Sequence, residues 1–254
     1  MKNIHKQVAV ALAALSLAGG AAAQVITIDL VTVGNPGNTA DTSTYGAVAY
    51  SYAIGKYEVT NTQYAAFLNA TAATDTYSLY NSSMDGIAQT GSSGSYHYTV
   101  NGGFENKAVN YVSFWDAARF ANWLNNGQGG GSTETGSYTL TSGGISANTV
   151  TRNGGTNWVV ASENEWYKAA YYDPTKNSGA GGYWLHATRS DTLGNNTAFS
   201  ATNGANYYDG DYVVFTSGND GALPVGSYAN AASYYGTFDQ GGNLWEWNEG
   251  RILF

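Results

Sequence analysis

The sequence predicts a single α+β domain in which long irregular segments separate three short helices from several short strands. Three observations support this. Three segments carry helix start signals followed by apolar residues at helical spacing. Several short runs alternate apolar and polar residues, as strands do. Glycine supplies 33 of the 254 residues and only 11% are charged, a composition typical of a chain with long surface loops.

The first 23 residues are expected to be removed before the domain folds. Lys2 and Lys6 precede a short apolar run over residues 8–17, and Ala21-Ala22-Ala23 stands before Gln24. This order is typical of a secretory signal peptide, and the run is too short to cross a bilayer. No later stretch reaches the roughly 20 apolar residues of a transmembrane helix. We therefore expect a mature chain of residues 24–254 without a transmembrane segment, periplasmic or secreted.

Charge and cysteine content exclude several classes of function. The formal charge of −8 becomes −10 once Lys2 and Lys6 are removed, and no basic cluster is present. Such a chain is not expected to bind nucleic acid. The sequence has no cysteine, which excludes disulfides, thiolate nucleophiles and thiolate metal sites within it. His97 and His186 are the two histidines of the mature chain, too few for a three-histidine metal site.

The predicted elements begin with two strands. Residues 25–33 alternate apolar and polar side chains, and residues 45–59 do so at roughly period two. Further short strands are expected at residues 138–140, 158–161, 212–215, 224–227 and 244–247. Long irregular loops are expected over residues 81–95, 125–144 and 176–182.

Each predicted helix begins with a capping box, in which a Ser or Thr is followed three residues later by Gln, Asp or Glu. Thr60 opens the first helix, Ser113 the second and Ser162 the third. Capping explains the two serines better than a role as nucleophile does. Asp173-Pro174 is expected to end the third helix.

The segment from Gly241 to Trp247 is the strongest candidate for a functional site. Trp245 and Trp247 flank Glu246 behind a Gly-Gly-Asn turn. Large aromatic side chains favour burial, and a carboxylate between them needs a cation or hydrogen-bond donors. We expect a core strand that carries one metal-ligating acid; the alternative is a structural salt bridge from Glu246 to Arg119 or Arg189.

Five segments, in order, resemble the formylglycine-generating enzyme (sulfatase-modifying factor) family. They are YEVTNTQY at residues 57–64, VNYVSFWDA at 109–117, ASENEWYKAA at 161–170, PVGSY at 224–228 and GNLWEW at 242–247. Ala108 stands where the family usually has proline, and Ala121 where it often has cysteine. The resemblance implies a loop-rich variant of the C-type lectin fold.

The resemblance also implies structural calcium. Family members hold Ca²⁺ near this Trp-Glu-Trp segment, and the matching positions here are Gly241, Gly242, Leu244 and Glu246. A second implied site matches Asn206, Tyr207, Asp220 and Ala222. Carbonyl and carboxylate oxygens in glycine-rich turns are ligands that Ca²⁺ accepts.

The catalytic groups of the family are not matched. Its formylglycine generators use a cysteine pair that holds copper, downstream of the position of Trp247, and related oxygenases use three histidines around iron. Neither copper nor iron is therefore expected here. The sequence stops at Phe254, so we expect a domain that lacks the family's C-terminal part.

Three functions remain open at this stage. The first is a calcium-stabilised, non-catalytic domain that binds a protein or glycan at the cell surface or has a structural role there. The second is an N-terminal fragment of an oxidase that acts on a sulfatase cysteine. The third is a carbohydrate-binding, lectin-like module.

Overall fold

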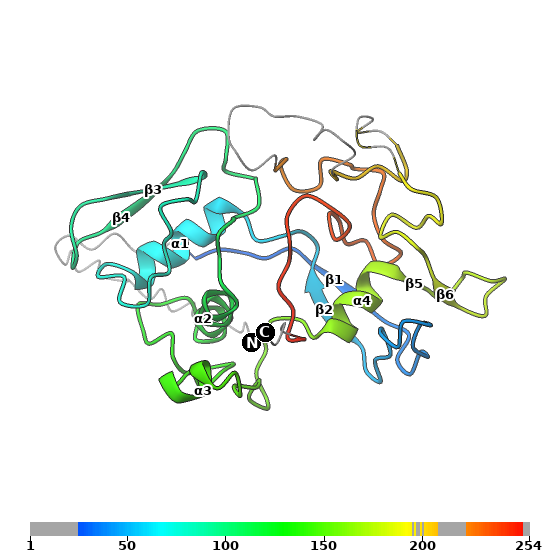
Figure 1. Ribbon diagram of the computed structural model, residues 1–254, viewed down its shortest axis with the longest axis horizontal. Helices are drawn as coiled ribbons and strands as arrows, with labels where there is room; N and C mark the ends of the chain where they lie inside the picture. The colour runs from blue at the N-terminus through cyan, green and yellow to red at the C-terminus, as the bar shows by residue number, and fades with distance from the viewer. Residues whose placement is uncertain (1–24, 195, 197–198, 200, 208–221, 251–254) are drawn as a thin grey trace, which may run out of the picture.

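A computed structural model describes residues 25–194, 196, 199, 201–207 and 222–250. Its elements are short and widely separated by loops (Figure 1). In order they are β1 (Leu30–Val33), β2 (Tyr52–Gly55), α1 (Asn61–Thr71), β3 (Ile87–Thr90), β4 (His97–Val100), α2 (Phe114–Asn125), α3 (Ser142–Ser146), α4 (Glu163–Tyr171), β5 (Tyr172–Asp173) and β6 (Gly182–Tyr183). This confirms the predicted loop-rich α+β class.

The three capping boxes are confirmed, and they set the starts of α1, α2 and α4. The hydroxyls of Thr60, Ser113 and Ser162 each accept a hydrogen bond from the backbone N–H three residues later. The side chain of that third residue accepts from the cap's own N–H in return. At the N-terminus of each helix, two backbone N–H groups that have no partner within the helix are therefore hydrogen-bonded by side chains.

The described strands form three antiparallel pairs of two strands each. Strand β1 pairs with β2, with Val31 opposite Ile54, while β3 pairs with β4 and β5 with β6. Two predicted strands are much shorter than expected, since only 30–33 and 52–55 form a ladder. Some elements were not predicted: β3 lies within the loop expected at 81–95, α3 begins within the one expected at 125–144, and no strand was expected at β5 or β6.

The main core is aromatic and lies where α1 packs against α2 and β4. Tyr64 and Phe67 of α1 face Phe120 and Trp123 of α2, with ring centroids 5.4–6.0 Å apart. All four residues are buried. Edge-on and tilted ring contacts of this kind add to the stabilisation from burial.

The segment from 241 to 250 runs between the α1–α2 part and the α4 part of the molecule (red in Figure 1). The predicted strand at 244–247 is wrong, because these residues are irregular and Trp245 is fully exposed. Residues 138–140 and 224–227 form only isolated bridges, 158–161 are irregular, and 212–215 lie outside the described residues. No helix in the described part of the chain has both the length and the apolar character to cross a membrane.

Candidate functional site

The site is built on a tight turn between Asp239 and Leu244. The N–H of Gly242 donates to the carbonyl of Asp239 at 3.0 Å. Asp239 and Asn243 both have positive φ, at 65° and 63°. Aspartate and asparagine are the non-glycine residues that tolerate this backbone region best. The turn therefore depends on residue types that the sequence places at these positions.

Asn206 holds this turn from a distant part of the chain. Its carbonyl accepts from the N–H of Asn243 at 2.7 Å, and its Nδ2 donates to Oδ1 of Asn243 at 3.1 Å. The approach is so close that a Cβ on Gly242 would lie 2.5 Å from the Asn206 carbonyl oxygen. The structure thus brings Asn206 of the second implied calcium set against Gly242 of the first, although the two residues lie far apart in the sequence.

Glu58 completes the support of the turn, and the sequence analysis did not single it out. Its carboxylate accepts from the N–H of Leu244 at 3.1 Å and from Nδ2 of Asn243 at 2.5 Å. Oδ1 of Asn243 also accepts from the N–H of Leu223 at 2.9 Å. The sequence signals for Glu58 were its place in the family-like segment at 57–64 and its position between Tyr57 and Val59 just before the first capping box.

Three carboxylates near this turn influence one another. Burial raises the pKa of Glu58 well above its usual range, and the charges of Glu246 and Asp239 raise it further. Burial also raises the pKa of Asp239, against a hydrogen bond from the N–H of Gly226. Glu246 has solvent-accessible surface, but its carboxylate lies among many protein atoms, and this loss of hydration raises its pKa as well. A cation here would relieve the repulsion between these groups.

Glu246 is bonded to a tryptophan of α4 rather than to an arginine. Nε1 of Trp166 donates to its Oε2 at 2.5 Å. The two arginines suggested as partners are engaged elsewhere, because Arg119 pairs with Glu134 at 2.7 Å and Arg189 with Asp173 at 3.5 Å. Within the described residues, neither Arg119 nor Arg189 therefore forms the salt bridge to Glu246 that was considered as an alternative.

Of the other residues of the second implied set, the structure describes Tyr207 and Ala222. Asn196 Nδ2 donates to the carbonyl of Tyr207 at 3.2 Å, and the Tyr207 hydroxyl donates to the carbonyl of Gly194. Ala222 is buried next to Leu223. Asp220 lies outside the described residues.

The donor chemistry at the turn fits calcium better than a transition metal. The described residues contain no grouping of three His, Cys, Asp or Glu side chains suited to a metal ion. A cation at Gly241, Gly242, Leu244 and Glu246 would thus rely on backbone carbonyls and one carboxylate. Hard oxygen ligands of this kind are those that Ca²⁺ takes.

A second set of contacts fastens the end of the segment to α4. Arg152 Nε donates to both oxygens of Glu249, at 3.0 and 2.9 Å, and Nη2 donates to Glu165 at 2.9 Å. The hydroxyl of Tyr138 donates to Glu249 at 2.7 Å, and the N–H of Glu249 donates to Ala161. The guanidinium of Arg152 therefore links Glu165 of α4 to Glu249, which follows the Trp-Glu-Trp segment.

Residues 16–251 match the family of the sulfatase-modifying factor enzyme 1-like domain. The chain belongs to this family. The match covers the turn, Glu58, Asn206 and the three capped helices, and it begins within the segment predicted as a leader.

Solved and curated proteins add little beyond this family membership. The chain is similar to the crystal structure of CarF, with 19% identity, a TM-score of 0.47, and coverage of 85% of this chain and 77% of that one. None of the curated proteins matches. The sulfatase-modifying factor family is therefore established by the sequence match alone.

Proposed function

We propose that this member of the sulfatase-modifying factor family is an exported, calcium-stabilised domain that does no thiol-dependent catalysis with the residues of this sequence. In this proposal it has a binding or structural role at the cell surface. The proposal extends the family membership, which by itself specifies neither export nor metal.

The observation that carries the calcium proposal is the support given to the Gly-Gly-Asn turn. Glu58 and Asn206 fix its backbone from two distant parts of the chain. A carbonyl-based calcium site needs such a fixed backbone, because its ligands cannot be aimed by side-chain rotation. These contacts therefore fix the backbone of the turn through protein groups.

The non-catalytic part of the proposal depends on which residues the sequence has. The family's formylglycine generators bind copper through cysteine thiolates, and these 254 residues include no cysteine. The family-like segments that the chain does have form the capped helices and the turn. Oxidation of a sulfatase-type cysteine peptide by the purified chain would contradict this part and favour the oxidase alternative.

Calcium titration tests the metal site. We expect Ca²⁺ to bind in calorimetry and to raise the melting temperature, because a ligand at 100 times its Kd adds about 2.7 kcal/mol to stability. Glu246→Gln should remove most of this gain. Glu105→Gln is the matched control, since Glu105 is an exposed acid that none of the calcium positions includes. Equal calcium responses in the two variants would refute the site.

Export is tested separately by cell fractionation. The chain with residues 1–23 should accumulate outside the cytoplasm, and the chain without them should stay inside. Recovery of both in the cytoplasm would contradict the predicted leader.

One observation favours carbohydrate binding as a second candidate function. Trp245 is fully exposed, and Trp247 is 45% exposed with its Nε1 bonded to the carbonyl of Val112 at 2.7 Å. A tryptophan ring that is both anchored and solvent-facing can stack on a sugar ring. A glycan array probed with the chain and with Trp245→Ala tests this candidate, and identical profiles would dismiss it.

A further inference from the structure

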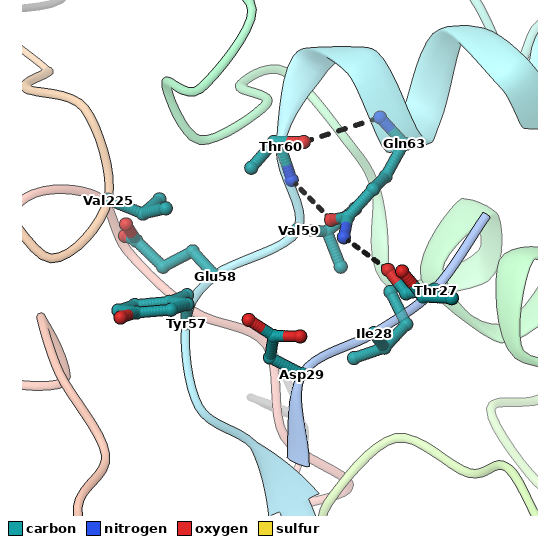
Figure 2. A pocket seen from close by; sticks show the side chains of 9 residues that line it. All are labelled: Thr27, Ile28, Asp29, Tyr57, Glu58, Val59, Thr60, Gln63 and Val225. Carbon is teal, nitrogen blue, oxygen red and sulfur yellow. Dashed lines mark hydrogen bonds between the residues drawn. The ribbon is translucent and has the colours of Figure 1, made fainter.

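A cavity of about 180 Å³ lies between the N-terminal segment and the start of α1 (Figure 2). One wall is Thr27, Ile28 and Asp29, just before β1. The opposite wall is residues 57–60 with Gln63, and Val225 closes one end. The cavity is lined by three segments that are far apart in the sequence, so only the folded chain forms it.

The cavity is large enough for a group about the size of one amino-acid side chain. It is smaller than the roughly 300 Å³ at the lower end of ordinary ligand pockets. It has room for about six water molecules at about 30 Å³ each. The occupant is therefore a short linear group rather than a nucleotide or a whole sugar.

The walls combine apolar surface with negative charge. Ile28, Val59 and Val225 are aliphatic and Tyr57 is aromatic. Gln63 and Thr60 satisfy each other through the capping box, and Gln63 Nε2 donates to the carbonyl of Thr27 at 2.9 Å. The other polar groups of the walls that could bind a ligand are the carboxyl groups of Asp29 and Glu58.

Asp29 is the group best placed to bind a ligand. Figure 2 shows its carboxylate directed into the space between the two walls, whereas Glu58 turns toward Val225. Within the described residues, no hydrogen bond or ion pair to the Asp29 carboxylate is seen. Both carboxyl oxygens of Glu58 are held by the turn at Asn243 and Leu244, so Glu58 does not offer a free ligand atom.

The aromatic wall already accepts an ammonium group within the chain. Lys56 Nζ lies 5.0 Å from the centroid of the Tyr57 ring and 5.5 Å from that of Phe238. Attraction between a cation and an aromatic face is the physical reason for this arrangement. The same ring borders the cavity, and the net charge of −8 favours the approach of cations.

We propose that this cavity binds an alkylammonium group, with its methylene chain along Ile28, Val59 and Val225 and its charge at Asp29. The chemistry is shared by a lysine side chain of a partner and by a small free amine. A bare divalent cation fits less well, because Ca²⁺ needs six to eight oxygens and, among the described residues, Asp29 offers the one lining carboxylate that is not already hydrogen-bonded. The cavity shares Glu58 with the support of the proposed calcium turn, but its charged ligand group is Asp29, which none of the calcium positions includes.

The experiment is a titration followed by methyl NMR of Ile28, Val59 and Val225. The probes are Nα-acetyl-lysine amide, cadaverine and, as an uncharged control, 1-pentanol, each with calcium and with a chelator. We expect saturable shifts of these methyl groups with both amines and much weaker ones with the alcohol. Tighter binding of the lysine derivative identifies a protein partner as the source, and tighter binding of cadaverine identifies a free amine.

Two substitutions locate the charge. Asp29→Asn is expected to weaken binding at least tenfold, and because Asp29 is exposed the variant should fold as the native chain does. Asp191→Asn removes an equally exposed acid outside the cavity and should change affinity less than twofold. Equal losses in both variants, binding of 1-pentanol as tight as that of the amines, absence of saturation, or displacement of the amine by Ca²⁺ would each overturn the proposal. Loss of calcium binding alone would leave it standing.

Discussion

Removing Arg152 tests how the segment after Gly241 is held to the rest of the protein. The guanidinium joins Glu165, whose side chain is 6% exposed, to Glu249, whose side chain is 20% exposed. Arg152→Met keeps much of the apolar stem but leaves both carboxylates without their cation. We expect a large loss of stability, because an uncompensated buried charge is costly.

The size of the expected loss of stability follows from the pKa of Glu165. Burial alone would raise this pKa, but hydrogen bonds from Arg152, from the N–H of Ser162 and from the Tyr50 hydroxyl lower it to about 2. The ordinary value is about 4.3, and each unit corresponds to about 1.4 kcal/mol. Glu165 therefore contributes about 3 kcal/mol at pH 7, of which Arg152→Met should remove about 2 kcal/mol, since the other two donors remain.

The sign of the pH dependence is fixed by the same values. Because the folded-state pKa of Glu165 lies below the unfolded value, its contribution is fully present above about pH 4.3 and is lost as the pH falls toward 2. The difference between the native chain and Arg152→Met should therefore be largest at neutral pH and shrink in acid.

Urea denaturation at several pH values measures this difference. Arg189→Met is the matched control, because Arg189 is about half exposed and pairs with Asp173 at 3.5 Å, so its loss should cost less than about 1 kcal/mol. A loss in Arg152→Met no larger than that of the control, or one that is constant from pH 7 to pH 3, would refute the reasoning.

Two further predictions concern the backbone around the turn. Asn243→Gly keeps the positive φ but loses the side-chain bonds and should cost about 2 kcal/mol, while Asn243→Ala should cost about 1 kcal/mol more from strain, both by chemical denaturation. Gly226 has φ +72°, and a Cβ there would lie 2.6 Å from the Tyr57 ring, whereas Gly94 has φ +94° and open space around it. Gly226→Ala should thus lower the melting temperature clearly more than Gly94→Ala; equal shifts would show that the Tyr57 ring moves freely.

Much of the local structure follows from sequence patterns. The starts of α1, α2 and α4 are determined by side chains three residues apart, so a reader of the sequence finds them at Thr60, Ser113 and Ser162. The class and the family follow from ordered motifs spread over the chain. These features depend on residues that are close together in the sequence, so their hydrogen bonds and spacing can be inferred from the sequence.

The site and its surroundings were decided by tertiary contacts. Glu58 and Asn206 meet the turn at Asn243 from positions 185 and 37 residues away, and no local pattern marks such a partner. Trp245 was expected in a core strand, yet it is exposed because no strand forms there and the packing at this segment goes through Glu246 and Trp247 instead. The cavity beside Asp29 likewise exists only where three distant segments meet. The sequence by itself determined the capped helices, the loop-rich class and the family, because these depend on the spacing of residues along the chain. Which carboxylates and carbonyls lie together at the site depended on the closure of long loops, which only the folded chain specifies.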